Sequence, residues 1–281
     1  MKVGRAKSLA ASCLREAGIE SPDFEADLLL EWVFGLSRAF IHAHPEKDLS
    51  AEKFPRFHEA IKRRCSREPL QQIIGETGFF GLSFEVAKGV FIPRQETEFL
   101  VETALEVFPG GFFIDWGTGS GCIAATILAN RHSAACVAVD SSPRALRVAW
   151  RNLKKYGLLS RALLWHGKDP WEVPMNAASA DLVISNPPYI PESQILSLMP
   201  EVRLHDPREA LSGGSDGLDA YRILLPWAFH VLKAGGTHVL EIGGKDQEQE
   251  VRSLASTFRF VKSVRDYLGH PRVLVLQKER F

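Results

Sequence analysis

Apolar residues at helical spacing dominate the N-terminal part of the chain. Over residues 3–17 they recur three and four positions apart, as on one face of a helix. The order Ser-Pro-Asp at residues 21–23 is that of an N-cap, a first-turn proline and an acid that suits the helix dipole, which predicts a helix over residues 24–34. Another helix is predicted over residues 50–68. We therefore expect a helical bundle over residues 1–74.

The rest of the chain has the pattern of an α/β fold. Residues 75–92 are rich in aromatic, β-branched and glycine residues, which predicts a linking β-hairpin. Over residues 93–281, apolar runs alternate with helical stretches, as in a doubly wound, Rossmann-like domain. The last two runs lie so close together that they should form an antiparallel hairpin. The predicted strands are 112–115, 135–139, 162–165, 182–185, 236–242, 260–264 and 273–277.

The most informative stretch is Asn186-Pro187-Pro188-Tyr189, which follows the apolar run 181–185. In open α/β sheets, ligands bind at the carboxyl ends of the strands. Prolines have no N–H, so the backbone here offers carbonyl acceptors, and Asn186 adds an amide oxygen. Tyr189 adds an aromatic face. Such a surface suits a planar NH2 group, although Asn-Pro and Pro-Pro are also typical of a rigid turn.

A glycine-rich turn lies upstream, between a predicted strand and a predicted helix. Its glycines let the backbone approach a ligand closely, and the helix N-terminus offers unpaired N–H groups. The turn therefore predicts a site for a nucleotide-like cofactor. It consists of Asp115, Trp116, Gly117, Thr118, Gly119, Ser120 and Gly121.

Two cofactor classes compete for this turn. Residues 119–124 also match the loose dinucleotide pattern G-x-G-x-x-G/A, and Asp140 ends the next strand. In either case the Asp140 carboxylate would bind the ribose hydroxyls. Asp115 favours the second class, because an acid before the first glycine suits a cationic ammonium group better than a pyrophosphate. S-adenosylmethionine carries such a group.

Together, these motifs resemble class I methyltransferases that use S-adenosylmethionine. Further stretches narrow the resemblance to the bacterial release-factor glutamine methyltransferases, and it covers essentially the whole chain. Trp116 departs from the family pattern because a smaller aliphatic residue is expected there, and Asp206 replaces the usual Glu. Residues 243–247 are also less regular than the pattern. The matching stretches are 18–22, 91–98, 206–211, 213–218 and 240–243.

The resemblance implies that a methyl group passes to the side-chain nitrogen of the glutamine in the Gly-Gly-Gln loop of class 1 peptide chain release factors. The N-terminal bundle would bind that substrate protein. Asn186 and the Pro187 carbonyl would each accept an N–H of the amide, while Pro188 and Tyr189 would hold its plane. The methyl donor would be bound by Asp115, Gly117, Thr118, Gly119, Ser120, Gly121, Asp140, Trp171 and Asn186.

Other functions stay open at this point. A glutamine methyltransferase that acts on a ribosomal protein would share the catalytic motifs. An adenine or cytosine methyltransferase would also act on a planar amine, but 34 Lys and Arg balance 34 Asp and Glu, which leaves no basic field for nucleic acid. A non-catalytic dinucleotide-binding module would not need residues 186–189. We therefore expect an enzyme that requires no direct contact with nucleic acid.

The remaining polar residues predict no metal site. The four cysteines are scattered, and His42 and His44 have no third ligand nearby in the sequence. No apolar run reaches the length of a membrane span, so we expect a cytoplasmic protein. We also expect it to be a monomer. The basic cluster at residues 62–64 is expected to be a solvated helix end. The residues expected to close the site are Arg94, Thr97 and Glu98.

Overall fold

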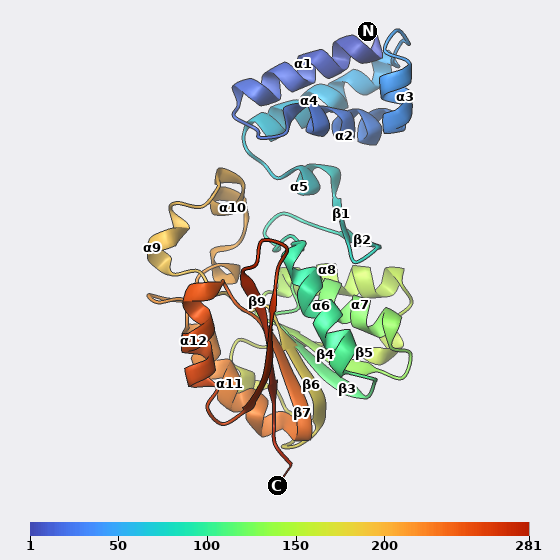
Figure 1. The fold of residues 1–281 in the computed structure, drawn as a ribbon. Coiled ribbons are helices and arrows are strands. Elements are labelled where there is room, and N and C mark those ends of the chain that lie inside the picture. Colours follow the sequence, from blue (N-terminus) through green and yellow to red (C-terminus); the bar gives the residue numbers. More distant parts are fainter. Residues whose placement is uncertain (281) are drawn as a thin grey trace. The chain divides into compact units, whose positions relative to one another are not determined.

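The computed structural model describes residues 1–280, which form two compact units (Figure 1). One unit comprises residues 1–76 and 199–205, and the other comprises residues 77–198 and the described residues from 206 onward. The chain therefore passes from one unit to the other three times. None of the described helices has the length and apolar content that a membrane span needs.

The first unit is a helical bundle with an apolar core of its own. Leu14, Leu29 and Phe57 are among the fully buried side chains of this core. The expected helices are present, and α3 and α5 are additional helices that the apolar periodicity did not predict. The elements are α1 (Val3–Glu16), α2 (Pro22–Phe34), α3 (Arg38–Ala43), η1 (Ala51–Lys53), α4 (Phe54–Cys65), α5 (Leu70–Ile74) and α10 (Pro200–His205).

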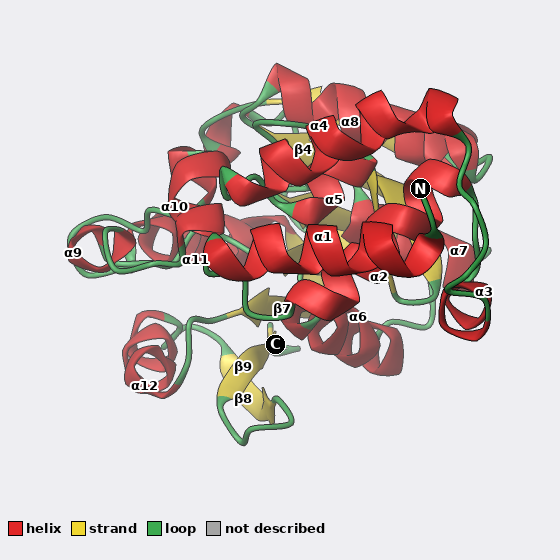
Figure 2. Cartoon of the chain, turned by 90° about the horizontal axis from the view of Figure 1, so that it is seen from above, coloured by secondary structure: helices red, strands yellow, loops and turns green. Residues whose placement is uncertain are grey.

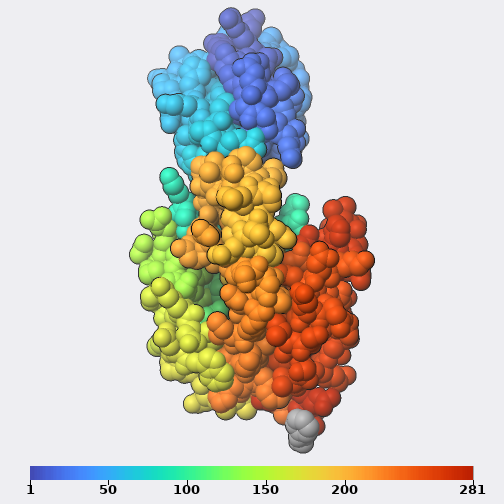
Figure 3. Space-filling view, turned by 90° about the vertical axis from the view of Figure 1, so that its left-hand side faces the viewer, coloured from blue at the N-terminus to red at the C-terminus, as the bar shows by residue number. Residues whose placement is uncertain are grey.

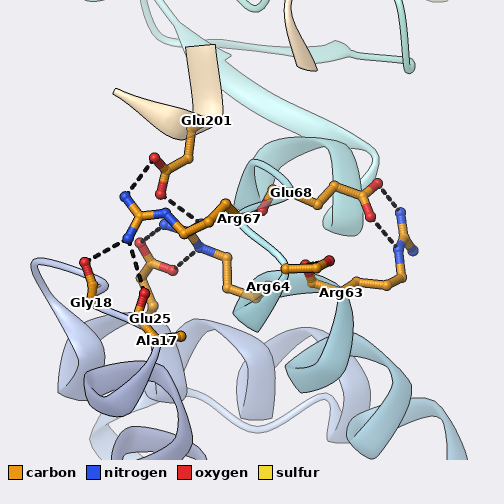
Figure 4. Close-up of polar contacts among 9 residues, drawn as sticks. Ala17, Gly18, Glu25, Arg63, Arg64, Arg67, Glu68 and Glu201 are labelled. Carbon is orange, nitrogen blue, oxygen red and sulfur yellow. Dashed lines mark hydrogen bonds and ion pairs between the residues drawn. The ribbon is translucent and has the colours of Figure 1, made fainter. Parts of the chain in front are cut away.

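The basic cluster at the end of α4 contains a buried arginine. Arg64 Nε donates to Glu25 Oε2 at 2.5 Å, and Arg64 Nη1 donates to Glu201 Oε1 at 2.9 Å (Figure 4). Arg67 Nη2 donates to the second carboxylate oxygen of Glu201 at 2.7 Å. The prediction of a solvated helix end is therefore wrong for Arg64. These ion pairs also explain why α10, which carries Glu201, belongs to the helical unit.

A β-hairpin lies within the predicted range 75–92. It consists of β1 (Glu76–Phe79) and β2 (Leu82–Glu85), which form a two-stranded sheet. Phe80 and Gly81 join the strands with φ values of +49° and +75°. A positive φ at both central residues is typical of a two-residue hairpin turn.

The second unit is built on a seven-stranded sheet with the order β5-β4-β3-β6-β7-β9-β8. The strands from β5 to β7 in this order are parallel, while β9 is antiparallel to both β7 and β8. Figure 2 shows the last two strands as a hairpin closed by a loop. The predicted doubly wound sheet with a C-terminal antiparallel hairpin is confirmed. The strands are β3 (Phe112–Trp116), β4 (Ala135–Asp140), β5 (Ala162–His166), β6 (Ala180–Ser185), β7 (Leu232–Glu241), β8 (Arg259–Arg265) and β9 (Pro271–Gln277).

Helices cover both faces of this sheet (Figure 1). Phe113 packs into the core beneath α6, α7 and α8, while its neighbour Ile114 packs into the core beneath α11 and α12. Because both faces are buried, the central strands are continuous apolar runs rather than alternating ones. The short helix α9 (Glu192–Ile195) lies in a surface segment (Figure 3). The longer helices are α6 (Glu96–Val107), α7 (Cys122–Asn130), α8 (Pro143–Lys155), α11 (Asp219–Val231) and α12 (Lys245–Leu254).

Candidate active site

The two predicted motifs meet where β3 and β6 end side by side. The strand order reverses between these two strands, and such a point is where open α/β sheets form their ligand crevice. Trp116 pairs with Ser185, and Ser185 Oγ donates to the Trp116 carbonyl at 3.0 Å. A Cβ atom on Gly117 would lie 3.8 Å from the Asn186 carbonyl oxygen. The glycine turn and the Asn-Pro-Pro-Tyr stretch are therefore direct neighbours.

Asp115 is fully buried beneath the glycine turn. Its Oδ2 atom accepts a hydrogen bond from Thr118 Oγ1 at 2.6 Å and another from Ala124 N at 3.2 Å. Its Oδ1 atom is buried and has no hydrogen-bond partner among the described residues. Burial raises the pKa of the Asp115 carboxyl to about 7, against the two hydrogen bonds that lower it. A buried carboxyl oxygen without a partner fits a cationic group of a ligand.

The glycine turn is shaped by its backbone and by Asp140. Gly119 has a φ of +56°, which a residue with a side chain rarely adopts. A Cβ atom on Gly121 would lie 3.0 Å from Ala149 Cα, so the turn packs directly on α8. Asp140 Oδ2 accepts from Gly119 N at 2.8 Å, and Asp140 Oδ1 accepts from Ser142 N at 2.8 Å. Asp140 thus anchors the turn and keeps further lone pairs for a ligand.

The Asn-Pro-Pro-Tyr stretch is tied to α6 and β7 through side chains. Asn186 Nδ2 donates to Thr97 Oγ1 at 3.1 Å, and this bond leaves Asn186 Oδ1 to accept hydrogen bonds. The Tyr189 hydroxyl donates to Glu241 Oε1 at 3.3 Å. Pro187 is buried, whereas Asn186, Pro188 and Tyr189 are partly exposed. These hydrogen bonds therefore hold the stretch in place, together with its acceptors, which are Asn186 Oδ1 and the backbone carbonyl groups.

Glu241 is a functional candidate that the sequence did not predict, although it lies in the matching stretch 240–243. It is buried at the end of β7, and its Oε1 accepts from the Tyr189 hydroxyl. Burial raises the pKa of the Glu241 carboxyl to about 7, while the Thr97 hydroxyl and the Tyr189 hydroxyl lower it. Only the partners of this carboxyl, which come from distant parts of the chain, reveal its place in the site.

Arg94, Thr97 and Glu98, the residues expected to close the site, form hydrogen bonds with different parts of the chain. Thr97 contacts Asn186, as described above. Arg94 Nη2 donates to Asp206 Oδ2 at 2.5 Å, and Glu98 Oε1 accepts from Phe80 N at 2.9 Å. Asp206, which departs from the family pattern, is therefore the ionic partner of Arg94. Burial raises the pKa of the Asp206 carboxyl to about 6.

Trp116, the other departure, has a packing partner. Its ring lies 5.5 Å from the ring of Trp227 on α11, measured between centroids. This large residue fills the core on that face of the sheet.

Trp171 lies apart from the other predicted cofactor residues. It belongs to a short 3-10 helix (Pro170–Glu172), is 54% exposed, and its ring lies 5.5 Å from the ring of His230. His230 is near the C-terminal end of α11, directly before β7 begins. That position is the edge where the parallel strands start, whereas Asp115 and Asn186 lie where they end. The structure therefore does not bring Trp171 into the candidate site.

The family models and the sequence relatives that match this chain indicate the same family. The family model described as the PrmC N-terminal domain matches residues 6–75, and the methyltransferase small domain matches residues 82–215. The release factor glutamine methyltransferase of Caulobacter vibrioides is 42% identical over 276 residues, which cover 96% of this chain and 94% of that protein. The release factor glutamine methyltransferase of Moorella thermoacetica is 40% identical over 278 residues, which cover 97% of each chain.

A solved structure supports the fold. A methyltransferase from Pyrococcus furiosus aligns with a TM-score of 0.54 at 17% identity, covering 82% of this chain and 100% of its own. At this identity the likeness concerns the fold alone. The sequence relatives, in contrast, are similar over nearly their entire length, and on that basis the chain belongs to the release factor glutamine methyltransferase family.

Proposed function

We propose that this protein transfers a methyl group from S-adenosylmethionine to the side-chain amide nitrogen of the glutamine in the Gly-Gly-Gln loop of peptide chain release factors. The observation that carries the proposal is the direct contact between the glycine turn and the Asn-Pro-Pro-Tyr stretch. A site for the methyl donor and a site for a planar amide are thereby adjacent. We expect the enzyme to act as a cytoplasmic monomer without nucleic acid.

The residues of the glycine turn fit the methyl donor. The unpaired Asp115 Oδ1 would face its ammonium group, residues 117–121 would line its methionine part, and Asp140 would bind its ribose. Bound S-adenosylmethionine would supply an electrophilic methyl group at this edge of the sheet. Trp171 is left out of the proposed site because of its position.

The Asn-Pro-Pro-Tyr stretch would prepare the acceptor. An amide nitrogen is a poor nucleophile because its lone pair is delocalised into the carbonyl group. Asn186 Oδ1 and the Pro187 carbonyl would each accept one N–H of the substrate amide, which orients the nitrogen and stabilises the positive charge that develops on it. Tyr189 and Pro188 would hold the amide plane. The alkylated nitrogen is acidic and loses its proton without a dedicated base.

One assay separates the candidate substrates. Radiolabelled methyl donor is supplied in parallel to a purified release factor, its loop Gln→Ala variant, ribosomal proteins and DNA. We expect label on the release factor and none on the loop variant. Label on a ribosomal protein alone, on DNA, or on the loop variant would overturn the proposal in favour of a different acceptor.

A further inference from the structure

Gln247 joins three loops of the methyltransferase unit through one buried side chain. It lies in the first turn of α12 and is 8% exposed. Its Nε2 donates to the Tyr189 carbonyl at 2.7 Å and to the Gly217 carbonyl at 3.2 Å, and its Oε1 accepts from Gly243 N at 2.9 Å. Both N–H groups and the oxygen of the amide are used. The side chain is therefore held in one orientation.

The glycines around Gln247 leave the space that its side chain occupies. A Cβ atom on Gly217, where φ is +80°, would come within 2.5 Å of both Gln247 Nε2 and the Tyr189 carbonyl oxygen. A Cβ atom on Gly243 would come within 2.7 Å of Gln247 Oε1. Such distances are far shorter than van der Waals contact, so both positions require glycine as long as Gln247 stays in place.

Backbone hydrogen bonds also hold Ile190, the residue that follows the Asn-Pro-Pro-Tyr stretch. Ile190 N donates to the Leu211 carbonyl at 2.9 Å, and Gly213 N donates to the Ile190 carbonyl at 2.9 Å. The residue that follows the Asn-Pro-Pro-Tyr stretch is therefore fixed to residues 211–213. Together with the bond from Gln247 to the Tyr189 carbonyl, these backbone bonds leave the end of the stretch little freedom.

This anchoring bears on the carbonyl that is proposed to accept the substrate N–H. Pro187 and Pro188 have a fixed φ angle and no N–H, so neither can hold its own position by donating a hydrogen bond. Their path is set by what holds the residues on either side. Asn186 is held through Thr97, and Tyr189 is held through Gln247.

We propose that Gln247 is a positioning residue for the methyl acceptor. It acts through the Tyr189 backbone to set the direction of the Pro187 carbonyl, and it contacts neither the methyl donor nor the acceptor itself. The inference rests on the proposed function, since it assigns a role within the same site.

The test replaces the amide with an apolar side chain of similar volume. Gln247→Leu removes all three hydrogen bonds, and Gln249→Leu is a matched control because Gln249 lies on the same helix and is exposed. Turnover is measured at saturating methyl donor against a range of release-factor concentrations, and donor affinity is measured by calorimetry. We expect kcat to fall at least about tenfold for Gln247→Leu, with a donor Kd within about threefold of the wild type. The control should match the wild type in both.

A second variant keeps the inference testable if Gln247→Leu folds poorly. In Gln247→Glu, the carboxylate still accepts from Gly243 N but repels the Tyr189 and Gly217 carbonyls. Its protonated form donates to one of them, so its kcat relative to the wild type should recover as the pH falls. A general loss of folding would not be reversed in this way.

The outcomes separate this inference from the proposed function. Normal kcat for a folded Gln247→Leu protein would overturn the positioning role, as would parallel losses of kcat and donor affinity with no recovery of Gln247→Glu at low pH. If the wild type labels another substrate in the parallel assay, the proposed function fails, and the same variants are then compared on that substrate.

Discussion

Asn186 Nδ2 donates a hydrogen bond to Thr97 Oγ1 at 3.1 Å, although the two residues are 89 positions apart in the sequence. The Thr97 hydroxyl also lowers the pKa of the Glu241 carboxyl, which burial raises. In the bond with Asn186, the Thr97 oxygen is the acceptor. Because the NH2 end of the Asn186 amide faces Thr97, the amide oxygen points away from Thr97.

Loss of this bond should impair the acceptor half of the reaction. Thr97→Val keeps the shape of the side chain but removes the hydroxyl, so the Asn186 amide is free to turn its NH2 group towards the substrate. We expect kcat to fall about tenfold or more, with the donor Kd changed by less than about threefold. Steady-state kinetics with a release factor and calorimetry with the donor check this.

Thr97→Ser retains the hydroxyl and is the control for that experiment. It should restore most of the lost turnover. Equal activity of the Val and Ser variants would show that the hydroxyl does not orient Asn186.

Donor affinity should depend on pH through Asp115. Burial raises its pKa to about 7, so the carboxyl is neutral in much of the unliganded protein below that pH. A cationic donor binds the ionised form better, and binding therefore releases a proton. On the acid side of pH 7, Kd should tighten by up to about tenfold per pH unit as the pH rises, and then level off.

Calorimetry in two buffers of different ionisation enthalpy measures both the affinity and the released proton. Asp115→Asn should bind the donor more weakly, and its affinity should no longer vary with pH over this range. A flat profile for the wild type would contradict a charged contact between Asp115 and the donor.

Removal of the Trp171 ring should leave donor binding intact. The residue is 54% exposed and packs against His230 at the edge where the parallel strands begin. We expect the donor Kd of Trp171→Ala to change by no more than about twofold, as for a surface substitution. A tenfold weakening, measured by calorimetry, would instead place Trp171 in the cofactor site.

The helical unit should depend on its buried arginine. Arg64→Leu leaves the carboxylates of Glu25 and Glu201 without this partner in a partly buried setting, which should lower the free energy of unfolding by about 3 kcal/mol. Arg63→Leu removes only a more exposed pair with Glu68 and should cost less than about 1 kcal/mol. Urea denaturation of the two variants distinguishes these values, and equal losses would argue against a special role for Arg64.

The sequence by itself determined most of the helices and strands and the chemistry of the strand ends. Helices of this chain repeat apolar residues every three to four positions, whereas its central strands are continuous apolar runs. Parallel strands all end at one edge, so Asp115 and Asn186 had to lie at the same edge of the sheet. Their side-chain types then indicated a cationic cofactor and a planar amide. Each of these inferences uses residues that are close together in the sequence or repeat at a fixed period.

Only the tertiary structure decided which distant polar groups meet. Arg64 with Glu201, Thr97 with Asn186, and Gln247 with Tyr189 join segments that no local pattern relates. From the sequence alone, a charged or amide side chain at the surface cannot be distinguished from one in a buried network. Its role depends on the partner that folding brings within hydrogen-bond distance, because burying a polar group without a partner costs free energy.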